Sequence, residues 1–236
     1  MSCMIWANIN SKGGTGKTTL TAILASEIVR LGGTVALVDS DPNQPLKRWH
    51  DALPNTKQIS VLVDADQSGD TLAETITRAK ERADFVLVDT EGSENNRMAM
   101  LPYLAEMMLL PIQLSKHDLV EAQKVESYLQ KVSANSKTFV PRIIVPTRVS
   151  AAIRTKTETV LRAELANTGL PVLDPPILDK DAFKQMFTQG KLLHELPPSS
   201  GIKSAQENAR AAFEGLARTY TSIVKSQHEN AQPAHA

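Results

Sequence analysis

The residues of this chain that could do chemistry are most concentrated from Lys12 to Thr18, which read KGGTGKT. An apolar run precedes this segment and a helical pattern follows it, as in a phosphate-binding loop, although Ser11 stands where the usual pattern begins with glycine. Three glycines would let the backbone curl so that successive N–H groups point at phosphate oxygens: Gly13, Gly14 and Gly16. The segment therefore predicts a site for a nucleotide's phosphates.

The end of this loop supplies the charge and the hydroxyl group that such a site needs. Lys17 is expected to contact the β- and γ-phosphates, and Thr18 to bind Mg²⁺ through its hydroxyl. A helix that begins near Lys17 would add its positive N-terminal end. The residues expected to hold the phosphates are Gly13, Gly14, Thr15, Gly16, Lys17, Thr18 and Thr19.

Three aspartates lie at the ends of two strongly apolar runs. Asp39 and Asp41 follow the run TVALV, and Asp89 ends the run FVLVD. Open α/β sheets bind their ligands at the carboxyl ends of strands, so these carboxylates should lie beside the phosphates. Of the first two, one could hold Mg²⁺ and the other could orient the attacking water, while Asp89 would hold Mg²⁺ through water.

Alternating strands and helices must position these residues. The apolar patterns predict helices over 18–31, 70–82, 117–132, 155–166 and 204–225. They predict strands over 4–10, 34–39, 58–63, 85–89, 107–112, 139–145 and 170–173. Such alternation predicts a single α/β domain, a doubly wound and mostly parallel sheet with helices on both faces, of the P-loop NTPase class. The domain is expected over 1–227, with a polar tail at 228–236.

The composition excludes several classes of protein. Lys+Arg and Asp+Glu number 26 each among 236 residues, so any contact with nucleic acid requires a local basic patch. The single cysteine, Cys3, excludes a disulfide scaffold and a thiolate metal cluster. No apolar run approaches the roughly 18 residues that span a bilayer, and the first residues do not read as a secretory signal. We expect a cytoplasmic protein.

The second lysine of the loop, Lys12, is not required by an ordinary phosphate loop. It stands too early to share the phosphate pocket of Lys17, so we expect it to reach a nucleotide across a symmetric interface, as an arginine finger does. The segment NSKGGTGKTT resembles the deviant Walker A motif of the ParA/MinD family, in which the early lysine is the signature residue. Three further segments resemble that family in the expected order: VALVDSDPNQP, FVLVDTEG and LLPIQLSKHDLVEAQKV.

The resemblance implies ATP and Mg²⁺ as cofactors. It assigns hydrolysis to Asp41, and it implies catalytic roles for Lys12 and Lys17 and a metal site at Thr18, Asp39 and Asp89. It also implies an adenine pocket in the loops after the later strands, at Thr147, Arg148, Pro175 and Pro176. The sequence departs from the family at two positions, where Asn43 replaces the usual Gln and Glu91 the usual Pro.

Basic residues are concentrated in one part of the chain, since 137–162 holds six of them against one acid. Such segregation can present a positive face to DNA phosphates, although solvated helix charges would give the same pattern. The expected DNA contacts are Arg148, Arg154, Lys156, Arg162 and Lys203. The resemblance implies an ATP-dependent sandwich dimer that binds nucleoid DNA without sequence preference. A ParB-like or other adaptor would stimulate slow hydrolysis, so that plasmid DNA or another cargo is partitioned or positioned.

Several alternatives remain at this point. The segments DPNQPLKRW and DTEGSENN resemble accessory ATPases of conjugal and T-DNA transfer. A MinD-like ATPase of the membrane surface would need a basic amphipathic helix at the C-terminal end, which HENAQPAHA does not provide. A redox ATPase like the nitrogenase iron protein would need paired cysteines, and a ligase-synthetase of biotin metabolism would need a substrate pocket that the sequence does not reveal.

Overall fold

The chain forms one parallel sheet in a computed structural model that describes residues 3–64, 69–91, 96–136, 139–151 and 156–231. Its strands are β1 (Met4–Asn8), β2 (Val35–Ser40), β3 (Ile59–Val63), β4 (Phe85–Thr90), β5 (Met107–Ile112) and β6 (Arg142–Pro146). The six strands follow the order β3-β2-β4-β1-β5-β6, and every neighbouring pair is parallel. Both β2 and β5 are buried at every position, as expected for strands covered on both faces.

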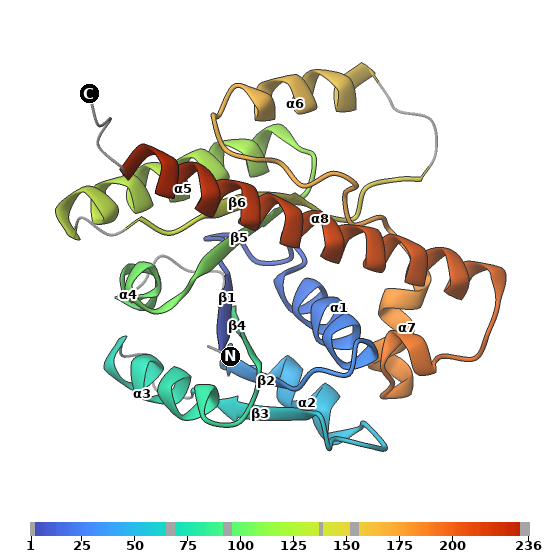
Figure 1. Cartoon of the computed structure of the whole chain (residues 1–236). Coiled ribbons are helices and arrows are strands. Elements are labelled where there is room, and N and C mark those ends of the chain that lie inside the picture. The colour runs from blue at the N-terminus through green and yellow to red at the C-terminus, as the bar shows by residue number, and fades with distance from the viewer. Residues whose placement is uncertain (1–2, 65–68, 92–95, 137–138, 152–155, 232–236) are drawn as a thin grey trace.

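Helices cover both faces of this sheet. They are α1 (Lys17–Arg30), α2 (Pro45–Asp51), α3 (Gly69–Lys80), α4 (Asn96–Leu104), α5 (Lys116–Ser136), α6 (Lys156–Ala166), α7 (Asp181–Gln189), the 3-10 turn η1 (Leu193–Glu195) and α8 (Ser200–Ala231). One apolar layer joins α1, α2, α7 and α8 to the sheet, and the other joins α3, α4, α5 and α6 to its opposite face. Figure 1 shows α1 and α4 on opposite sides of the strands. The predicted fold class is confirmed.

The sheet places polar residues side by side at its carboxyl edge. In the parallel register, Asp89 at the end of β4 is level with Asp39 on β2 and with Asn8 on β1. The loops after β1, β2 and β4 therefore open at one edge, which is where α/β folds of this kind bind ligands.

Some predicted elements differ from the structure. The prediction of a strand over 170–173 is wrong, because this segment makes only a single β-bridge, between Val172 and Ile144. Three short helices, α2, α4 and α7, were not predicted. Pro45 begins α2, Pro102 interrupts the apolar pattern of α4, and α7 has only nine residues. Helix α8 extends to Ala231, four residues into the segment expected as a tail. Within the described residues, no helix combines the length and the apolar character needed to cross a bilayer.

Candidate nucleotide-binding site

The glycine-rich loop joins β1 to α1 at the carboxyl edge of the sheet. Gly14 and Gly16 have φ angles of +78° and +94°, which residues with a Cβ rarely adopt. A Cβ at Gly16 would also lie 3.4 Å from the Thr147 side chain, which follows β6. The Thr147 hydroxyl donates a hydrogen bond of 2.6 Å to the Thr15 carbonyl, so the end of β6 braces the loop. The loop thus has a fixed curvature that leads directly into α1.

Lys17 begins α1 and carries its ammonium back over the loop. Its side chain is buried, and Nζ donates hydrogen bonds to the carbonyls of Lys12 at 3.0 Å and Asn10 at 3.4 Å. Burial lowers the pKa of this lysine, while the charges of Asp89 and Asp41 oppose the shift. A desolvated ammonium inside a ring of backbone groups is suited to binding a phosphate oxygen, which would replace the carbonyl partners.

Thr18 and Asp89 form the centre where Mg²⁺ is expected. The Thr18 hydroxyl donates a hydrogen bond of 2.6 Å to Asp89 Oδ2, although 71 residues separate the two along the chain. Asp89 Oδ1 is buried and has no hydrogen-bond partner among the described residues. Burial raises the pKa of Asp89 to about 7, and the nearby charge of Asp39 adds to the rise. A buried carboxylate oxygen without a donor and a hydroxyl beside it fit the hard oxygen ligands that Mg²⁺ prefers.

The two aspartates after β2 have different surroundings. Asp39 is fully buried, and its two carboxylate oxygens accept hydrogen bonds from the backbone N–H of Asp41 at 3.3 Å and of Lys47 at 2.9 Å. Burial raises the pKa of Asp39, and these backbone donors oppose the rise. Asp41 is partly exposed, and its carboxylate accepts from the Asn43 backbone N–H at 2.8 Å. Asp39 therefore anchors the loop that carries Asp41, and its role as a metal ligand stays a prediction.

Lys12 lies at the rim of the loop and pairs within its own chain. Its Nζ lies 2.5 Å from Oδ1 of Asp118, in the first turn of α5. The Asp118 side chain is only 2% exposed, whereas that of Lys12 is 40% exposed. Ser11 and Glu121 make a second contact between loop and helix, at 3.1 Å. Sequence reasoning missed Asp118 because its role depends on a contact across 106 residues, although it lies within the segment that resembles the family.

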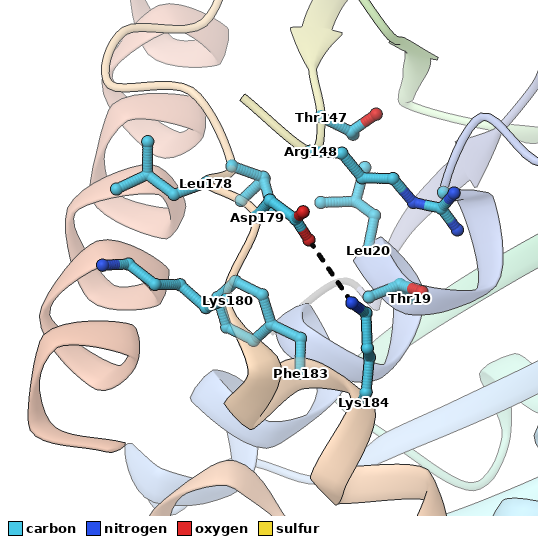
Figure 2. Close-up of a pocket in the computed structure, with 11 residues that line it drawn as sticks. Thr19, Leu20, Thr147, Arg148, Leu178, Asp179, Lys180, Phe183 and Lys184 are labelled. Atoms are coloured by element: carbon cyan, nitrogen blue, oxygen red, sulfur yellow. Dashed lines mark ion pairs between the residues drawn. The ribbon is translucent and has the colours of Figure 1, made fainter. Parts of the chain in front are cut away.

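A pocket lies beside the glycine loop, between α1, the residues that follow β6 and helix α7 (Figure 2). Thr147 and Arg148, two of the predicted adenine-pocket residues, line it. The other two, Pro175 and Pro176, do not line the pocket, because they come just before the segment that does. The Pro176 carbonyl instead accepts a hydrogen bond of 2.8 Å from Asn208 on α8. The lining residues that the predicted set omitted are Leu20 of α1 and six that lie after those prolines and on α7: Ile177, Leu178, Asp179, Lys180, Phe183 and Lys184.

The pocket combines an apolar floor with charged groups at its mouth. Phe183 is 3% exposed, and Leu20 of α1 is buried opposite it. In Figure 2 the side chains of Asp179 and Lys184 face each other, with Nζ 3.8 Å from Oδ1. Lys180 points away towards α8, where it donates to the Ser204 hydroxyl at 3.1 Å. An apolar pocket with a few polar groups at its edge is the usual form of a site for a small molecule or cofactor.

The predicted DNA contacts do not lie on a single element. Arg148 is exposed at the mouth of the pocket, with a φ angle of +51°. Arg162 on α6 is paired with Glu158 at 3.0 Å, whereas Lys203 is exposed near the start of α8. Arg154 lies outside the described residues, and Lys156 begins α6 with a side chain that is likewise not described. Of the predicted set, Arg148 and Lys203 are the exposed residues in the part of the chain whose side chains the structure describes, and their contact with DNA stays a prediction.

Comparison with known proteins places these features in a family. The family model described as VirC1 protein matches residues 3–229. A protein named ParA from Rhizobium radiobacter is 28% identical over 218 residues, which cover 92% of this chain and 97% of that protein. Both matches extend over almost the whole chain, and the family model covers the glycine loop, the aspartates and the pocket residues.

Solved structures share the fold. An ATP complex of a McdA variant from Cyanothece has a TM-score of 0.71 and 17% identity, and the match covers 92% of this chain and 97% of that one. The septum site-determining protein MinD of Pyrococcus horikoshii, complexed with Mg-ADP, has a TM-score of 0.62 and 21% identity, with coverage of 88% and 94%. At these identities the matches establish a common architecture.

Proposed function

This chain belongs to the VirC1 family, and we propose that it works as a ParA/MinD-type ATPase that binds ATP with Mg²⁺ and hydrolyses it slowly. The observation that carries the proposal is the meeting of the glycine loop, the buried Lys17 ammonium and the Thr18–Asp89 pair at one edge of the sheet. Further support comes from the matching folds of a McdA variant in complex with ATP and of MinD in complex with Mg-ADP.

The residues at the edge of the sheet would divide the work. Lys17 would exchange its carbonyl partners for phosphate oxygens, while the amides of the loop surround the same phosphates. Thr18 and Asp89 would hold Mg²⁺, which neutralises charge on the transferring phosphoryl group when it is bound. Asp41 would orient the attacking water, since its loop is anchored by Asp39 beside the same edge. A single carboxylate in this role is consistent with slow turnover, on the order of 10⁻³ s⁻¹ for isolated P-loop proteins.

Lys12 would connect ATP binding to pairing of two chains. We expect two copies to close face to face, with Lys12 of each chain reaching the phosphates bound by the other. For that movement, Lys12 must leave Asp118, and its 40% exposed side chain leaves a path outwards.

The closed dimer would bind DNA without sequence preference, through exposed basic residues such as Arg148 and Lys203. An adaptor protein of the ParB type, or another adaptor on the cargo, would stimulate hydrolysis and release the dimer. The cargo would be a plasmid to be partitioned, DNA in transfer or another assembly, and the dimer would act on the nucleoid.

Two lysine variants test the two parts of this proposal, ATP binding and ATP-dependent dimerisation. Lys17→Ala should abolish ATP binding, because the phosphates lose their buried cation. Lys12→Ala should keep ATP binding but lose dimerisation and the DNA binding that depends on it. The measurements are nucleotide titration, sizing and DNA retardation, each with a slowly hydrolysed ATP analogue. ATP binding by Lys17→Ala would overturn the assigned site, and dimerisation of Lys12→Ala at wild-type concentrations would overturn the role across the interface.

A further inference from the structure

Helices α2 and α7 are joined by a core tryptophan that also makes a directional hydrogen bond between them. Trp49 on α2 is 2% exposed, and its indole N–H donates a hydrogen bond of 3.1 Å to the Met186 carbonyl on α7. Its ring centre lies 5.7 Å from that of Phe187 on the same helix. The tryptophan therefore fixes α2 to α7 by one directional bond and one ring contact.

The C-terminal ends of the two helices also meet backbone to backbone. Gly190, which ends α7, has a φ angle of +56°, and a Cβ there would lie 2.5 Å from the carbonyl oxygen of Ala52, which ends α2. The Met186 carbonyl, which accepts the Trp49 bond, also accepts the Lys191 backbone N–H at 3.0 Å. The junction therefore leaves no room for the two ends to approach further.

Each helix leads from this junction to a different part of the site. Helix α7 is nine residues long, about 13 Å, and its N-terminal half carries Phe183 and Lys184 into the pocket beside the loop. Helix α2 begins just after the loop that carries Asp41, and its Lys47 backbone N–H is held by Asp39 at 2.9 Å. The base pocket and the Asp41 loop are thus at opposite ends of one chain of packed elements.

We propose that Trp49 is a positioning residue that makes the placement of Asp41 depend on the base seated against α7. This inference rests on the proposed function, because it takes the pocket as the site of the ATP base. A purine ring against Phe183 would fix α7, and Trp49 would pass that constraint to α2 and its preceding loop. Phosphates without a base would fill the glycine loop but leave the Asp41 loop without this support.

The two tryptophans of the chain supply a matched pair of variants. Trp6 on β1 is 3% exposed and packs against Phe85 and Phe213, with ring centres 5.8 Å and 5.9 Å away. Its indole nitrogen has no hydrogen-bond partner within the described part of the chain. Trp6→Phe and Trp49→Phe therefore remove similar buried volumes, but only the second removes a hydrogen bond.

Steady-state hydrolysis separates positioning from structural support. Trp49→Phe should lower kcat for ATP about fivefold, the effect of one lost hydrogen bond, at an almost unchanged KM. With slow chemistry, KM reports ATP binding, which the variant leaves intact. Trp6→Phe should keep the wild-type kcat. A wild-type kcat in Trp49→Phe, or an equal loss in Trp6→Phe, would overturn the positioning role. Wild-type protein without any turnover would instead refute the proposed function itself.

Tryptophan fluorescence gives a second readout that does not require Trp49 to be replaced. In Trp6→Phe, Trp49 is the remaining tryptophan of the chain, so its emission reports the α2–α7 junction. ATP should change this emission, whereas inorganic tripolyphosphate, which has no base, should leave it unchanged. Equal responses to the two probes would overturn the proposal, as would no response to saturating ATP.

Discussion

The pair of Lys12 and Asp118 gives a quantitative prediction about dimerisation. In this structure the Lys12 ammonium is held at 2.5 Å by a carboxylate that is almost fully buried. If each chain must release this lysine to reach its partner, the pair opposes dimerisation. Asp118→Asn should weaken the contact while keeping the shape of the side chain and the Asp118 backbone bond to the Ser115 hydroxyl at 3.1 Å.

The size of the effect follows from the chemistry of the pair. A hydrogen bond to a charged acceptor stabilises a fold by about 1 kcal/mol more than a hydrogen bond to a neutral one. We take no more than this value, because the Lys12 side chain is partly exposed and solvent weakens the pair. A symmetric dimer breaks two such pairs, so the variant should favour closure by about 2 kcal/mol. That change corresponds to a dimer dissociation constant about 30-fold lower in the presence of a slowly hydrolysed ATP analogue.

Sedimentation or light scattering over a range of protein concentrations measures this constant. Glu121→Gln is the matched control, since it removes one charge from the same helix but leaves the Lys12–Asp118 pair in place. If Asp118→Asn dimerises no more tightly than the wild type, or if the control shifts the constant equally, the Lys12–Asp118 pair does not oppose dimerisation.

Two further predictions concern the aspartates of the site. Asp41→Ala should lower ATP turnover by about 100-fold or more and trap the ATP-bound dimer, and unaltered turnover would count against its role. Asp89 has a pKa of about 7 in the fold against an ordinary 3.8, so the folded chain keeps a proton that the unfolded chain loses. Stability without Mg²⁺ should therefore fall between about pH 4 and pH 7, by up to ~4 kcal/mol. In Asp89→Asn, the free energy of unfolding measured by chemical denaturation should no longer fall over this pH range. An unchanged pH profile in the variant would contradict the raised pKa of Asp89.

The sequence alone predicts the parts of the fold that depend on local patterns. Continuous apolar runs such as the one ending at Asp39 identify buried parallel strands, and the glycines before Lys17 identify a loop that leads into a helix. Those two signals also place the aspartates and the loop at one edge of the sheet, because parallel strands all end on the same side. Fold class and the centre of the candidate site follow from them.

The sequence does not predict contacts that arise only when distant elements meet. The pocket lining from Ile177 to Lys184 shows no motif, since its apolar floor and charged mouth come from a loop and the short helix α7. Asp118 reads as an ordinary acid in the first turn of a helix until α5 packs beside the loop. Helix α2 has only seven residues, too few for a periodic pattern, and tertiary contacts of Leu46 and Trp49 define it.

The arrangement of the two lysines suggests how ATP binding and pairing become linked within one chain. Lys17 donates to the backbone carbonyl of Lys12 at 3.0 Å, and the Lys12 side chain in turn is bound by Asp118. When phosphates draw the Lys17 ammonium away, the backbone carbonyl of Lys12 loses the hydrogen bond that Lys17 donates to it. The cost of moving Lys12 from Asp118 is then lower with ATP bound than without it. By reciprocity, releasing Lys12 should also strengthen ATP binding, so Asp118→Asn should bind ATP more tightly than the wild type even at concentrations too low for dimers to form.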